Sequence, residues 1–87
     1  MQKLILNDGT ELNNSYAAET TENLFLYISN GMNMMQVMML MMDPQKINRI
    51  VYQSGENNQT EYDDYTTVMG VTLEYAGMVS VRLRRNL

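Results

Sequence analysis

A methionine-rich segment, which carries no charge from Asn33 to Met42, lies near the middle of the chain and limits the folds open to it. Residues 31–44 read Gly-Met-Asn-Met-Met-Gln-Val-Met-Met-Leu-Met-Met-Asp-Pro and hold seven of the ten methionines. We predict a helix here, because Asn33 can cap its N-terminus and Gln36 can bond back to the Asn33 backbone amide. Pro44 disfavours helical geometry in Asp43 and so ends the helix.

The predicted helix is apolar on more than one side. Helical periodicity sorts its side chains into one stripe made of Met35, Met38, Met39 and Met42 and a second made of Met34, Val37 and Met41. A single small sheet can cover only one of these sides, so we expect a partner to cover the other. The predicted partner is a second copy of the chain in a homo-oligomer, or another protein, and the predicted interface residues are Met34, Met35, Met38, Met39, Met41 and Met42. The alternative is a monomer whose sheet wraps far enough around the helix to bury it as core.

Two other coverings of the helix fit the sequence poorly. About ten helical residues extend roughly 15 Å, which is half of a hydrocarbon core, and the segment lacks the basic face of an interfacial helix. Copper(I) would suit thioether ligands, but the chain has no cysteine or histidine to complete a site, and core packing produces the same methionine spacing. We therefore predict neither membrane association nor a bound metal.

Length and charge limit the organisation of the protein and its ligands. The chain of 87 residues predicts a single domain over residues 1–87. Ten acidic residues against six basic ones give a net charge of −4, which disfavours binding to nucleic acid. Residues 1–9 lack the long apolar run and cleavage site of a secretion signal, so we expect a soluble intracellular protein.

The chain offers few groups for catalysis. The absence of histidine and cysteine removes the commonest general base and the thiolate nucleophile. Glu61, Asp63 and Asp64 form an acidic group, but no nucleophile with a base, phosphate-binding glycine loop or metal triad accompanies it. The six tyrosines are expected to pack on strands with their hydroxyls at water. We predict a protein that is not an enzyme, with no catalytic, cofactor-binding or metal-binding residue.

Strands are predicted before the helix. The Asp8-Gly9 turn predicts a hairpin between residues 3–6 and a return strand over residues 11–20, with an irregularity at Asn13-Asn14. Residues 24–28 place apolar side chains on both faces, which is typical of a central strand.

More strands are predicted after the helix. Residues 44–49 suit a short helical turn with Asp43 as cap and proline at its first position. Strands are expected over residues 49–53 and 60–64, the second at a sheet edge with Tyr62 among acidic neighbours. The whole order predicts the α+β class, with an antiparallel, strongly curled sheet or partly open barrel of about six or seven strands and one central methionine-rich helix.

The C-terminal hairpin permits a prediction of register. Apolar residues alternate on both of its strands, at Met69, Val71, Leu73 and Tyr75 and at Val79, Val81 and Leu83. A regular two-residue turn at Ala76-Gly77 would place Leu73 opposite Ser80 and point the two apolar rows to opposite faces. We predict instead a three-residue or bulged turn that pairs Leu73 with Val79 or Val81 and leaves Gly77 in the left-handed conformation.

The strand segments together resemble a known group of proteins. The segments are residues 4–11, 23–28, 50–52, 62–66 and 79–83. Their pattern resembles small proteins encoded in phages and prophages of Gram-positive bacteria, although the helical region of those relatives is more mixed in polarity. The resemblance implies a phage accessory or structural component that works through protein contacts, in the host cytoplasm or in the virion. The competing hypothesis is a small acidic phage-encoded inhibitor of a host defence protein.

Overall fold

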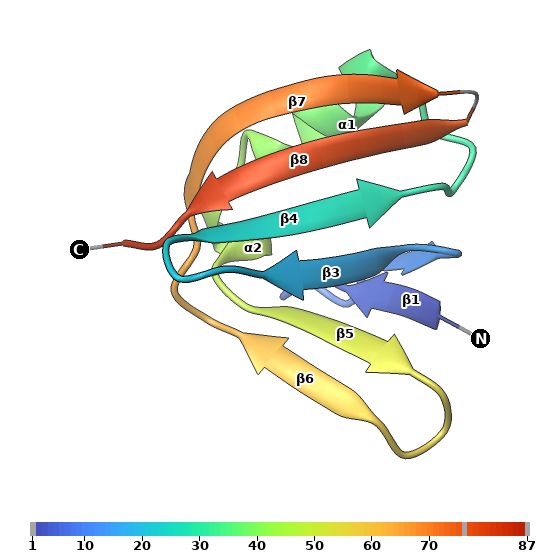
Figure 1. The fold of residues 1–87 in the computed structure, drawn as a ribbon, viewed down its shortest axis with the longest axis vertical. Coiled ribbons are helices and arrows are strands. Elements are labelled where there is room, and N and C mark those ends of the chain that lie inside the picture. The colour runs from blue at the N-terminus through green and yellow to red at the C-terminus, as the bar shows by residue number, and fades with distance from the viewer. Residues whose placement is uncertain (1, 76, 87) are drawn as a thin grey trace.

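Two antiparallel four-stranded sheets make up most of the fold (Figure 1). The computed structural model describes residues 2–75 and 77–86. The elements of these ranges are β1 (Gln2–Ile5), β2 (Glu11–Asn13), β3 (Tyr16–Glu19), β4 (Asn23–Ile28), α1 (Met34–Met41), α2 (Pro44–Ile47), β5 (Ile50–Ser54), β6 (Gln59–Tyr62), β7 (Thr67–Tyr75) and β8 (Met78–Arg84). Sheet A has the strand order β2-β1-β5-β6, and sheet B has the order β3-β4-β8-β7.

The chain passes from sheet A to sheet B at Asn14. This residue has a φ of 56°, a left-handed conformation that asparagine adopts more readily than most residues. The buried Ser15 hydroxyl holds the corner, because it donates to the Asn13 carbonyl oxygen at 3.0 Å and accepts from the Ser29 backbone N–H at 3.3 Å. The strand predicted over residues 11–20 is therefore two strands in two sheets.

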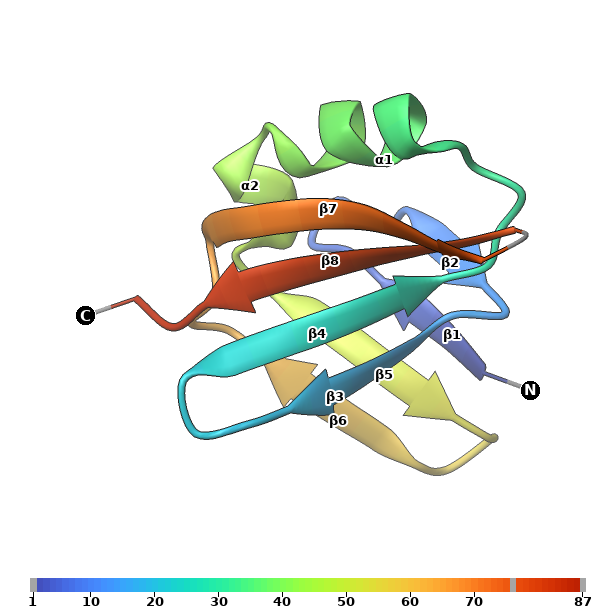
Figure 2. The same cartoon turned by 45° about the horizontal axis from the view of Figure 1, so that its top comes forward.

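This change of sheet corrects the predicted architecture. The α+β class and the antiparallel pairing are confirmed, but a strongly curled sheet or partly open barrel of about six or seven strands is wrong. The described residues form eight strands in two sheets, without a closed or strongly curled barrel. The main helix, α1, is not central either, because it lies with α2 at one side of the molecule next to β7 (Figure 2).

One hydrophobic core joins the two sheets and the helices. Alternate side chains of β4 and β8 point into it, and β4 is an interior strand between β3 and β8, as predicted. Sheet A and the helices fill the rest of the core. The largest fully buried side chains include Leu4, Leu12, Leu24, Leu26, Ile28, Val37, Ile47, Ile50, Val79, Val81 and Leu83.

Both helices begin as the sequence predicts. The Gln36 backbone N–H donates to Asn33 Oδ1 at 2.8 Å, and the Asn33 backbone N–H donates to Gln36 Oε1 at 2.9 Å, which completes the capping box. Asp43 caps α2 by accepting from the Gln45 backbone N–H at 3.0 Å, with Pro44 at the first helical position. Within the described ranges, neither helix combines the length and apolar content that crossing a membrane requires.

The β7–β8 hairpin has the predicted register. Leu73 lies opposite Val79, a bulge separates the Leu73 and Tyr75 pairs, and Gly77 has a φ of 81°. Ala76, the other predicted turn residue, lies outside the described residues. A second bulge, between the pairs of Val68 and Gly70, was not predicted, and it takes Met69 out of the apolar row.

In sheet A, the predicted first hairpin and the predicted edge strand are both present. β1 and β2 form the first hairpin, with Leu4 opposite Leu12 and a φ of 91° at Gly9. β6 is an edge strand of sheet A, as expected. Tyr62, however, is half-buried and packs against the core, with its ring edge-on to Tyr65 at a centroid distance of 6.4 Å.

Candidate functional site: an apolar surface on α1 and β7

The two methionine stripes of α1 lie in opposite environments. The stripe that faces the core contains Val37, which is fully buried, Met41, which is 3% exposed, and the half-buried Met34. The other stripe faces solvent, with exposed fractions of 70% for Met35, 49% for Met38, 66% for Met39 and 77% for Met42. The helix is therefore covered on one side only, which matches the argument that a small sheet cannot enclose it.

The six predicted interface residues consequently divide into three groups. Met35, Met38, Met39 and Met42 are available at the surface, Met34 is half-buried, and Met41 belongs to the hydrophobic core. Because Met41 is almost fully buried, it is a core residue and offers a partner little surface to contact. The interface role of the exposed methionines stays a prediction.

Strand β7 extends the exposed apolar stripe. A hollow of about 230 Å³ lies where α1 meets β7, and its walls are Met38, Met41, Met42, Val68 and Val71. Leu73 continues the row of Val71 on the same face of β7 and is 59% exposed. We define the methionine surface as Met35, Met38, Met39, Met42, Val68, Val71 and Leu73. None of these side chains carries a charge.

The β7 part of this surface was missed in the sequence. The alternation of Val71 and Leu73 predicts a strand with one apolar face, and such a face is normally buried. The available signal was the low charge of this segment, because Glu74 is the single charged residue among the nine residues of β7. Sequence spacing alone does not reveal that β7 would become an edge strand beside α1.

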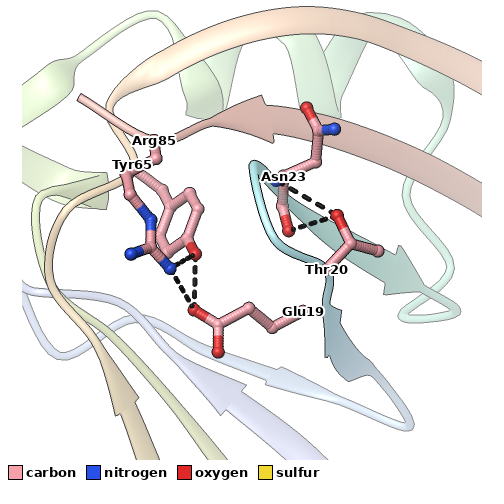
Figure 3. Close-up of polar contacts among 5 residues, drawn as sticks. All are labelled: Glu19, Thr20, Asn23, Tyr65 and Arg85. Atoms are coloured by element: carbon pink, nitrogen blue, oxygen red, sulfur yellow. Dashed lines mark hydrogen bonds and ion pairs between the residues drawn. The ribbon is translucent and has the colours of Figure 1, made fainter. Parts of the chain in front are cut away.

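A polar cluster elsewhere in the molecule ties chain segments together (Figure 3). The buried Tyr65 hydroxyl donates to the Glu19 carboxylate, and Arg85 Nη2 donates to the Tyr65 hydroxyl at 2.7 Å and to Glu19 Oε2 at 3.3 Å. The Arg85 guanidinium also lies over the Tyr65 ring, 5.4 Å from its centroid. In the turn that follows Glu19, the Asn23 backbone N–H donates to Thr20 Oγ1 at 3.2 Å. We call Glu19, Tyr65 and Arg85 the clasp.

The clasp holds chain segments together and leaves no reactive group free. Burial, reinforced by the hydrogen bond to Glu19, raises the pKa of Tyr65 above its ordinary value of 10.0. A phenol held protonated and already bonded to two partners is not available as a base or nucleophile near neutral pH. The clasp joins β3, the segment after β6 and the C-terminal segment, and it corrects the expectation that every tyrosine hydroxyl would lie at water.

The predicted acidic group does not form a metal site. Glu61 pairs with Arg49, whereas Asp63 and Asp64 are exposed. Among residues 2–75 and 77–86, no three histidine, cysteine, aspartate or glutamate side chains come together to hold an ion.

The outer face of sheet B also carries a hollow, of about 290 Å³, beside Phe25 and Tyr27. It contains both Arg82 and Glu74, and the Glu74 carboxylate accepts a hydrogen bond from Ser80 Oγ at 2.7 Å. Opposite charges in one small hollow favour neither an anionic nor a cationic ligand. The methionine surface is therefore the stronger candidate for function. Comparison with protein-family models, curated proteins and solved structures finds no match to this chain.

Proposed function

We propose that this protein is not an enzyme and works through protein–protein contacts, associating with a second copy of itself through the methionine surface. The observation that carries the proposal is the exposure of four helix methionines beside a hollow with apolar walls. Removing one such side chain from water contributes roughly 1–2 kcal/mol, given its partial exposure. An uncharged patch of this kind on a small protein is typical of an interaction surface.

The chemistry of the surface favours a protein over a small molecule. The hollow of about 230 Å³ is smaller than the roughly 300–1,000 Å³ of most small-molecule sites. Methionine is flexible and polarizable, so it adapts to side chains of an opposing protein surface. The hollow therefore suits a small group of apolar side chains from a partner protein.

The family resemblance suggests a setting for this activity. We propose a phage accessory or structural component, in the host cytoplasm or the virion, whose partner is itself or another phage or host protein. The alternative of an acidic inhibitor receives less support, because Glu11, Glu19 and Glu61 are in ion pairs with basic residues. This pairing reduces the free negative charge that such an inhibitor would present.

Sedimentation velocity over a range from low micromolar to millimolar protein tests the proposal. We expect the wild type to form a dimer and the double variant Met35→Lys with Met42→Lys to remain a folded monomer. The two sites are seven residues apart, so the new lysines avoid the repulsion of an i,i+4 pair. The matched control is Asn57→Lys with Asn58→Lys, which adds the same charge at two exposed loop residues. A wild type that stays monomeric throughout this range would overturn the proposal.

A further inference from the structure

The four sheet edges of the molecule differ in how they are protected. The edge strands β2, β3 and β6 have three or four residues each, and each carries a glutamate in an ion pair. These pairs are Lys3–Glu11 at 2.8 Å, Arg85–Glu19 at 3.3 Å and Arg49–Glu61. Short edge strands with charged side chains resist pairing with other chains, because a charge cannot be placed easily in a continuous sheet.

The fourth edge, β7, is long and almost uncharged, and its two bulges leave the residues from Gly70 to Leu73 in regular pairing with β8. It has nine residues, and the run from Thr67 to Leu73 contains neither a charge nor a proline. Its single charged residue, Glu74, bonds to Ser80 of β8. A long and uncharged edge strand presents unpaired backbone N–H and C=O groups that can pair with another strand.

We propose that two copies of the chain pair through β7 in antiparallel orientation, which joins the two B sheets into one sheet of eight strands. The inference rests on the proposed self-association and names its geometry. Two-fold symmetry is the commonest symmetry of homo-oligomers, and a two-fold axis perpendicular to the sheet pairs identical edge strands in antiparallel orientation.

The position of α1 lets this geometry bring the methionine surfaces of the two copies together. A two-fold axis perpendicular to the sheet keeps the same face of both B sheets on the same side. α1 packs beside β7 (Figure 2). The α1 helices of the two copies therefore come to lie near each other along the new strand pair. The exposed methionines of each helix then cover those of its partner, and strand pairing and methionine contacts bury one continuous surface.

Charge favours a second copy at this edge. Each copy carries a net charge of −4, so two copies repel each other, and a contact region with little charge adds least to this repulsion. Along β7 the single charge is Glu74, which lies on the outer face with Ser80 and away from the methionine surface. The pairing therefore adds little like-charge repulsion.

The area available also suits a dimer at the small end of the known range. A standard interface buries about 800 Å² per partner over 20–30 residues, or roughly 30–40 Å² per residue. The nine residues of β7 and the four exposed methionines would then bury on the order of 400–500 Å² per copy. An interface of this size is typical of weak, transient complexes, so we expect a reversible dimer.

Hydrogen–deuterium exchange at low and high protein concentration tests the strand pairing. In the dimer, we expect the peptide covering β7 to contain amides that exchange about tenfold or more slowly than in the monomer. The peptide covering β6, an edge strand of sheet A, serves as an internal control, and its exchange should not change. Sedimentation that shows a dimer while β7 exchange stays unchanged would overturn the strand pairing and leave the proposed self-association standing. A monomer at all concentrations would overturn both.

A substitution on the outer face of β7 separates strand pairing from methionine contact. Thr72 lies opposite Ser80, is exposed, and points away from the methionine surface. In the paired sheet, two Thr72→Lys side chains near the two-fold axis repel each other and weaken the dimer by roughly threefold to tenfold, and added salt restores part of this loss. Thr60→Lys on β6 is the matched control, with no expected change. If Thr72→Lys dimerises like the wild type while Met35→Lys with Met42→Lys does not, the dimer forms through the helices alone and the β7 inference is wrong.

Discussion

The two faces of α1 both carry methionine, but one face is buried in the core and the other is exposed to solvent. Met41 is enclosed by the core, whereas Met39, two residues before it, is two-thirds exposed. Both are uncharged thioethers in one helix, so their chemistry does not distinguish them. Abundant methionine therefore marks an apolar helix, and the packing of β7 against one side of α1 decides which methionines are core.

The largest expected contrast comes from placing a charge on each face. Met41→Lys should lower the free energy of unfolding by on the order of 3–5 kcal/mol, because the ammonium would be buried without a partner. Met39→Lys should leave the free energy of unfolding within about 0.5 kcal/mol of the wild type. Urea denaturation of both variants at low protein concentration measures the difference. Equal losses of stability would mean that the two faces of α1 are not distinct.

Removing apolar volume gives a smaller contrast of the same kind. Val37→Ala should cost about 2 kcal/mol, because the fully buried side chain leaves a cavity against the core. Met35→Ala, on the exposed face, should change monomer stability by less than about 0.5 kcal/mol. Thermal unfolding followed by circular dichroism reports both values. A large loss in Met35→Ala would indicate that its side chain packs within the monomer.

Loss of the helix cap should affect both faces together. Asn33→Ala removes the acceptor of the Gln36 backbone N–H and should cost about 1 kcal/mol of stability. Fraying of the first turn would also displace Met34 and Met35, so the dimer should weaken in parallel. Urea denaturation and sedimentation on one preparation test this. A variant that keeps full stability would show that the cap adds nothing to α1.

The smallest effect concerns the clasp, which is separate from both faces of α1. The raised pKa of Tyr65 means that the folded state holds the phenol proton more tightly than the unfolded state. The resulting contribution to the free energy of unfolding is complete below pH 10, and it declines as the pH rises above 10 toward the pKa of Tyr65 in the folded state. Tyr65→Phe should therefore lose less stability than the wild type when the pH rises from 9 to 11. Met39→Lys, which leaves Tyr65 intact, should retain the wild-type dependence on pH.

Local features of the fold were predictable from the sequence, because neighbouring residues determine them. Asn33 with Gln36 and Asp43 with Pro44 place the starts of α1 and α2, since side-chain capping acts within one helical turn. The register of the β7–β8 hairpin followed from period-two alternation and from Gly77.

Features that depend on distant contacts were not predictable in this way. The change of sheet at Asn14 requires Ser29 to approach Ser15, which is fourteen residues away, and no local pattern specifies this approach. The bulge beside Gly70 likewise takes Met69 out of a row whose alternation had included it. For the candidate site, the exposed methionines were predicted as a group, but β7 as their neighbour was not.

The sequence by itself determined that an uncharged helix, capped by Asn33 at its start and ended before Pro44, would form between two sets of strands, because capping and periodicity are short-range effects. Only the tertiary structure decided which stripe of that helix is enclosed, since both stripes are equally apolar and differ solely in what packs against them. It also decided that β7 is an edge strand, because an edge is defined by the absence of a neighbouring strand, which no residue of β7 encodes.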